Sequence, residues 1–148
     1  MMPVGQGVNM ENNLNRFITA QEKDFLIALT EIEYGKKQSH WMWYIFPQIK
    51  GLGTTETSRH YAIENLEEAS QYLKHDLLGP RLIQISKALL KLEESNATTI
   101  LGSPDDLKLK SSMTLFAAVE NADPVFEAVL EKFFNGEKDP KTLGLLQS

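Results

Sequence analysis

The chain has 148 residues, of which 42% are hydrophobic and 24% charged, and its net charge is −5. This length fits one domain with a buried core, and the acidic balance argues against nucleic acid or an anionic membrane as the main partner, since both require a clustered positive field. The chain contains no cysteine, which excludes disulfides, thiolate metal sites and cysteine nucleophiles.

The N-terminal residues show no helical periodicity, and we expect residues 1–10 to form a loose tail before a single helical domain over residues 11–148. The tail lacks the basic and apolar regions of a secretory signal. No run in the sequence approaches the ~18 apolar residues of a membrane span. The sequence therefore predicts a cytoplasmic protein that does not associate with membranes.

The first helix is predicted to begin at a capping box, Thr19-Ala20-Gln21-Glu22, and to end at Gly35. A segment rich in aromatic residues and turn formers follows, from Ser39 to Thr54, and it contains both tryptophans of the chain. Pro47 prevents a helix from continuing through this segment. We expect one short helical turn that leads into an ordered loop.

Apolar residues then recur at helical spacing as far as the C-terminus. The predicted helices cover residues 57–63, a segment capped by Asn65, residues 80–94, a turn over 96–101, and three segments opened by Ser103-Pro104, Asp123-Pro124 and Asp139-Pro140. No alternating strand pattern appears. The sequence predicts an all-α fold, a single compact domain of about six to eight helices with an ordered aromatic loop.

The aromatic segment contains the first group of candidate functional residues. His40 is a candidate general acid or base, and Trp41 and Trp43 are placed to stack against a flat ligand. The alternative interpretation is that the tryptophans fill the core, as large aromatic residues usually do, while His40 bonds to backbone. Both interpretations remain open from the residues alone.

The second group is Lys108, Ser111, Ser112 and Thr114, which fall on one predicted helix. Hydroxyl side chains compete for backbone hydrogen bonds inside helices, and a local rule broken in this way is typical of a functional site. Lys108 would contact an anion, and the hydroxyl groups would donate to a ligand. The alternative is that these hydroxyl groups pack between closely spaced helices.

Tyr61 is a further candidate, as a phenol donor to a ligand, although it also fits a solvated helix face. The three histidines show no metal-ligand spacing with one another or with carboxylates. We therefore predict no metal site and no cofactor.

Two long motifs indicate a family. The segment His40-Trp41-Met42-Trp43-Tyr44-Ile45-Phe46-Pro47-Gln48, followed by Gly51-Leu52-Gly53, resembles the signature of a bacterial family known as domain of unknown function 1810, whose members are sometimes mislabelled calpastatin. The segment from Ile100 to Phe116 is similar to a second part of that signature, and the likeness covers residues 13–146. The resemblance implies a small, mainly helical, single-domain cytoplasmic protein, and it implies no activity.

The two stretches with the strongest resemblance are the same two that break local expectations. We predict that they face each other across a cleft between the His40–Gly53 loop and the Ser103–Phe116 helix. A small polar ligand, nucleotide-like or phosphorylated, would bind or react there, with Gln48 contacting it through the carboxamide. The alternatives are a protein–protein interaction module without catalytic activity and a purely structural role for the aromatic segment.

Overall fold

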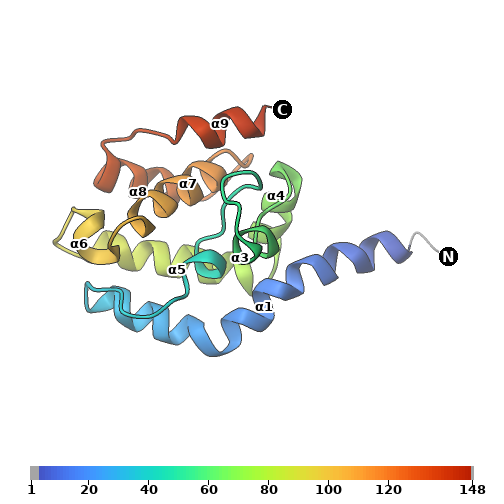
Figure 1. Ribbon diagram of the computed structural model, residues 1–148, viewed down its shortest axis with the longest axis horizontal. Coiled ribbons are helices and arrows are strands. Elements are labelled where there is room, and N and C mark those ends of the chain that lie inside the picture. Colours follow the sequence, from blue (N-terminus) through green and yellow to red (C-terminus); the bar gives the residue numbers. More distant parts are fainter. Residues whose placement is uncertain (1–3, 148) are drawn as a thin grey trace.

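The computed structural model describes residues 4–147, with side chains from residue 14 onward. In this part of the chain nine helices and no strand pack into a single compact domain (Figure 1), which confirms the all-α prediction. The helices are α1 (Val4–Glu33), α2 (Met42–Ile45), α3 (Glu56–His60), α4 (Leu66–Lys74), α5 (Leu78–Lys91), α6 (Ala97–Leu101), α7 (Asp105–Ala117), α8 (Val125–Phe134) and α9 (Pro140–Leu146).

Helix α1 runs without a break through Thr19, so the helix start predicted there is wrong. Leu14 and Phe17 are both buried and lie three residues apart, so continuing the helix lets both pack into the core. The tail expected over residues 1–10 falls partly on residues 1–3, which lie outside the described residues. Residues 4–10 form the first turns of α1, which project away from the other helices (Figure 1).

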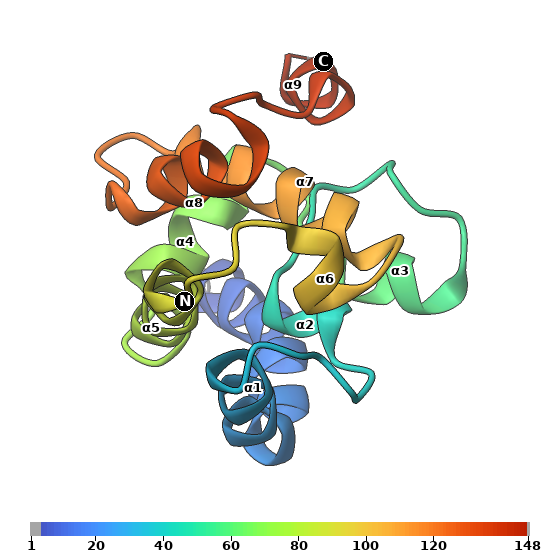
Figure 2. The same cartoon turned by 90° about the vertical axis from the view of Figure 1, so that its left-hand side faces the viewer.

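A row of buried aromatic rings joins four helices. Phe17 on α1 meets Tyr72 on α4 at 5.2 Å between ring centroids, Tyr72 meets Phe116 on α7 at 5.3 Å, and Phe116 meets Phe126 on α8 at 5.9 Å. Such offset and edge contacts add to the area that the rings bury. Helix α7 thus lies at the centre of the domain, and it also contacts α6 and α9. Helices α1 and α9 lie on opposite sides of the domain in both views (Figures 1 and 2).

Several helix ends follow the sequence signals. The side chains of Asn65, Asn96 and Asp139 each accept a backbone N–H in the first turn of the helix that they cap. Helix α7 begins at Asp105, with Pro104 at the cap position, one residue later than the Ser103 cap predicts.

The aromatic segment forms one short helix, α2, and then an extended stretch. A backbone bridge holds this stretch: Ile63 N–H donates to the carbonyl of Gln48, and Lys50 N–H donates to the carbonyl of Ile63, each at 2.8 Å. Gly51 follows with a φ of 106°, a conformation that favours glycine. The backbone on both sides of Ile49, the residue after Gln48, is therefore held in place by the segment that follows α3.

No helix in the described part of the chain is both long enough and apolar enough to cross a membrane.

Candidate functional site

A cleft of about 220 Å³ lies between the aromatic segment and α7, with the start of α9 at its side. We call it the α7 cleft. Its lining comes from the aromatic segment (Trp43, Gln48, Leu52, Gly53), from α7 and the residue before it (Pro104, Leu107, Lys108, Ser111) and from the first turn of α9 (Asp139, Lys141).

Gln48 is the most unusual residue of the cleft wall. The residue is 7% exposed, and its Nε2 is buried with no hydrogen-bond partner among the described residues. A buried polar group without a partner costs about 1–3 kcal/mol, so such groups are rare in folded proteins. A second, smaller cavity of about 20 Å³ also touches Gln48, and Tyr61 lines it. Gln48 therefore lines both the α7 cleft and this smaller cavity.

Close packing shapes the wall beside Gln48. A Cβ atom added to Gly53 would lie 2.5 Å from the Ser58 hydroxyl oxygen and 3.6 Å from the Trp43 ring. Ser58 is itself held, because its hydroxyl donates to the carbonyl of Thr55 and its N–H donates to the Thr55 side chain. The contact with Ser58 is too short for a Cβ atom, so glycine lets the loop approach α3 this closely, whereas the distance to the indole is an ordinary contact.

Lys108 contacts Trp43 within the lining of the cleft. The Lys108 ammonium group lies 4.0 Å from the centroid of the half-buried Trp43 ring, a cation–π contact. The same ammonium group is 3.1 Å from Oδ1 of Asp105, and the ammonium group of Lys37 is 2.8 Å from Oδ2. Burial favours the neutral form of Asp105, but the two lysines outweigh it and lower the pKa of the carboxyl. Asp105 is therefore ionised and holds Lys108 over the indole.

Hydroxyl groups of α7 attach α9 to this wall. Ser111 Oγ lies 3.3 Å from Oδ2 of Asp139 and 3.2 Å from the carbonyl of Leu107, and the N–H of Asp139 donates to Thr114 Oγ1 at 2.9 Å. Oδ2 of Asp139 also accepts from the backbone and the hydroxyl of Thr142. These contacts fix the start of α9 against the cleft.

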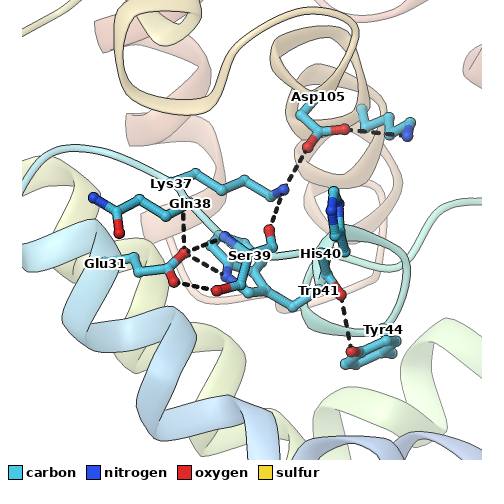
Figure 3. A network of polar contacts seen from close by, with 9 residues as sticks. Glu31, Lys37, Gln38, Ser39, His40, Trp41, Tyr44 and Asp105 are labelled. Atoms are coloured by element: carbon cyan, nitrogen blue, oxygen red, sulfur yellow. Dashed lines mark hydrogen bonds and ion pairs between the residues drawn. The ribbon is translucent and has the colours of Figure 1, made fainter.

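Glu31 on α1 organises the other end of the aromatic segment (Figure 3). Its carboxylate accepts four hydrogen bonds: from the N–H groups of Gln38 and Ser39, from Ser39 Oγ and from Trp41 Nε1, at 2.6–3.0 Å. Partial burial would raise the pKa of Glu31, but these hydrogen bonds outweigh it and lower the pKa to about 2. These hydrogen bonds to the carboxylate thus fix the conformation of residues 38–41.

The structure brings some of the predicted site residues together and separates others. Four of them line the α7 cleft: Trp43, Gln48, Lys108 and Ser111. Tyr61 lines only the small adjoining cavity, and its ring packs against Tyr44 at 5.1 Å.

The remaining predicted residues lie elsewhere. Trp41 is 1% exposed, so its ring fills the core as the alternative interpretation holds. Ser112 and Thr114 are fully buried. His40 is exposed, and no dashed contact in Figure 3 reaches its imidazole; only its carbonyl is engaged, by the Tyr44 hydroxyl.

Sequence reasoning missed three charged residues that shape the site. Asp105 and Lys108 are three residues apart on one helix, a spacing at which side chains meet, so the pair could have been found. Lys37 lies in the loop after α1, far from Asp105 in the sequence, and carries no such signal. Asp139 was interpreted only as a helix cap, which it is, but its carboxylate also lines the cleft.

The described residues contain no cluster of three or more His, Asp or Glu side chains suited to holding a metal ion.

Comparisons with known proteins identify the family of the chain. A search of curated proteins found no match. The conserved hypothetical protein Rv1873 from Mycobacterium tuberculosis is similar in structure, with a TM-score of 0.89 and 43% sequence identity over 92% of this chain and 97% of that one. The family described as protein of unknown function (DUF1810) matches residues 11–146. Since this match spans nearly the whole chain, the protein belongs to the DUF1810 family.

Proposed function

We propose that the protein binds a small polar ligand in the α7 cleft. The observation that carries this proposal is Gln48, a residue that lines the cleft and whose Nε2 is buried without a partner among the described residues. Binding sites keep such groups because the ligand supplies the missing partner. A ligand that accepts a hydrogen bond from Nε2 would remove the cost of leaving this amide unpaired.

The other cleft residues suit a ligand that also carries negative charge. Lys108 and Lys141 both line the cleft, and each carries an ammonium group. Ser111 adds a hydroxyl group whose oxygen can accept a hydrogen bond. Trp43 forms the wall, but Lys108 covers one face of its ring, so a flat ligand does not stack on that face. We assign no catalytic step, because His40 is outside the lining.

The volume of the cleft limits the size of the ligand that the sequence suggests. Pockets for drug-sized molecules enclose about 300–1,000 Å³, whereas this cleft encloses about 220 Å³. A whole nucleotide would therefore extend out of the cleft. A fragment with one charged group and one acceptor suits the volume better.

The test is a screen of small metabolites monitored by NMR. The protein holds two tryptophans, so its ¹⁵N spectrum has two indole signals, and a Trp43→Phe variant identifies the one from Trp43. A ligand of the cleft should shift this signal in the unmodified protein but not in Gln48→Leu. A compound that shifts the Trp43 signal equally in both proteins would count against the role of Gln48, and a screen with no shift at all would count against the proposal.

A second candidate function is protein–protein interaction, favoured by one face of α1. Leu26 and Ile27 are exposed on α1, and Tyr34, the residue that follows α1, is 85% exposed. An exposed apolar face of this kind is typical of partner surfaces. Analytical ultracentrifugation of the protein and of Leu26→Glu tests for self-association through this face: the unmodified protein should form a complex that the variant loses.

A further inference from the structure

The charges around the α7 cleft define how much negative charge a ligand can bring. Lys108, Lys141 and Asp139 line the cleft, and Asp105 joins Lys108 to Lys37 directly behind the wall. The three lysines carry three positive charges and the two aspartates carry two negative ones, so the net charge around the cleft is +1. The side chains of Lys37, Asp105 and Lys108 are 8%, 17% and 21% exposed, so solvent screens this excess charge less than at an open surface.

A singly charged ligand would neutralise this excess, whereas a doubly charged one would overshoot it. A phosphate monoester carries close to two negative charges at neutral pH. Placed in the cleft it would face the carboxylates of Asp105 and Asp139 with one charge unbalanced. Like charges a few ångströms apart in a partly buried site repel by more than they do in water. The charge balance therefore favours a monoanion.

The available hydrogen-bonding groups indicate which monoanion. Gln48 and Lys108 both line the cleft. Each carries a donor, the amide Nε2 and the ammonium group, and a carboxylate has two oxygens that can each accept such a bond. Oδ1 of Asp139 is not engaged by any described group, because its hydrogen bonds go to Oδ2. A hydroxyl or amide N–H on the ligand would find an acceptor there.

The size of the cleft sets the length of the molecule. A volume of about 220 Å³ corresponds to about seven water molecules at their share of the liquid. This space suits a short acid with one further polar group. The apolar rim of Leu52, Pro104 and Leu107 accommodates a few carbon atoms between the two polar ends.

From these observations we propose that the ligand of the α7 cleft is a small monocarboxylic acid that also carries a hydroxyl or amide group, with its carboxylate between Gln48 and Lys108. This inference rests on the proposed function and specifies its ligand class.

The test compares three probes that share an acetamidomethyl group, at alkaline pH: N-acetylglycine with one negative charge, N-acetylglycinamide with none, and (acetamidomethyl)phosphonate with two. Each is titrated into the protein while the Trp43 indole signal is followed. We expect N-acetylglycine to bind at least about tenfold more tightly than the other two, a difference of about 1.4 kcal/mol. Adenosine monophosphate serves as the large, doubly charged comparison and should bind no better than the phosphonate.

Two variants control for general charge effects. Lys108→Met keeps the length of the side chain over Trp43 and removes its charge, and it should abolish the preference for N-acetylglycine. Lys110→Met removes one charge from the same helix, but Lys110 pairs with Glu137 outside the cleft lining, so the preference should persist.

The outcomes separate the ligand class from the proposed function. Tighter binding of the phosphonate or of adenosine monophosphate, lost in Gln48→Leu, would overturn the monocarboxylate inference and leave the cleft as a binding site. Equal binding of the neutral amide would do the same. If none of the four probes shifts the Trp43 signal, the ligand class is overturned. The metabolite screen then tests separately whether the cleft binds any ligand.

Discussion

The two ends of the aromatic segment differ in how their buried polar groups are hydrogen-bonded. At one end, the carboxylate of Glu31 accepts four hydrogen bonds, including one from the buried Trp41 indole. At the other end, Nε2 of Gln48 is buried without a partner among the described residues. Folded proteins satisfy nearly all buried polar groups, so the Glu31 end follows the usual pattern of a structural anchor, and the exception at Gln48 supports the proposal that a ligand binds there.

The largest effect is expected from Glu31→Ala. This change leaves the Trp41 N–H buried without an acceptor and releases residues 38–41 from α1. We expect the free energy of unfolding to fall by about 3 kcal/mol, since hydrogen bonds to a charged group contribute about 1.5–3 kcal/mol each and the exposed donors can turn to water. Urea denaturation measures the loss; a change below about 1 kcal/mol would show that the network contributes little.

Low pH should remove the stability that the Glu31 carboxylate contributes. The pKa of Glu31 falls from its ordinary 4.5 to about 2 in the folded protein, so the folded state favours the ionised form. The resulting stability is present above pH 4.5 and is lost as the pH falls toward 2. Relative to Glu31→Gln, the unmodified protein should therefore lose its advantage across this window, and a stability difference independent of pH would contradict the assignment.

The Gln48 end should respond with the opposite sign. Gln48→Leu removes a buried amide that has no partner, so we expect the unliganded protein to gain about 1 kcal/mol while losing ligand binding. Ser112→Ala is the matched comparison, because Ser112 Oγ is also buried without a partner but does not line the cleft. Thermal unfolding measures both variants. A clear loss of stability in Gln48→Leu would mean that the amide is satisfied in the unliganded protein.

The smallest effect on stability is expected from Lys108→Met. The ammonium group is partly exposed and shares Asp105 with Lys37, so its removal should cost less than about 1 kcal/mol. Its effect on anion binding should be much larger. Comparing the denaturation midpoints of Lys108→Met and Lys110→Met checks the first point, and a loss of several kcal/mol in Lys108→Met alone would show that this lysine is mainly structural.

The helices themselves were largely predictable because their signals are local. Asn65, Asn96 and Asp139 cap helices where the sequence places them, since a side-chain cap depends only on residues two or three positions away. The start of α1 was not predictable in the same way. The capping box at Thr19 is a valid local signal, but burial of Leu14 and Phe17 favours a continuing helix.

The sequence by itself determined the all-α class and singled out the aromatic segment and α7 as the two unusual stretches, because helical periodicity and local composition can be seen directly in the sequence. Only the tertiary structure decided which of those residues share a cleft. Trp41 and Trp43 are two positions apart, yet one meets Glu31 in the core and the other meets Lys108 at the cleft. The partners that separate them come from α1 and α7, and such long-range contacts leave no periodic trace in the sequence.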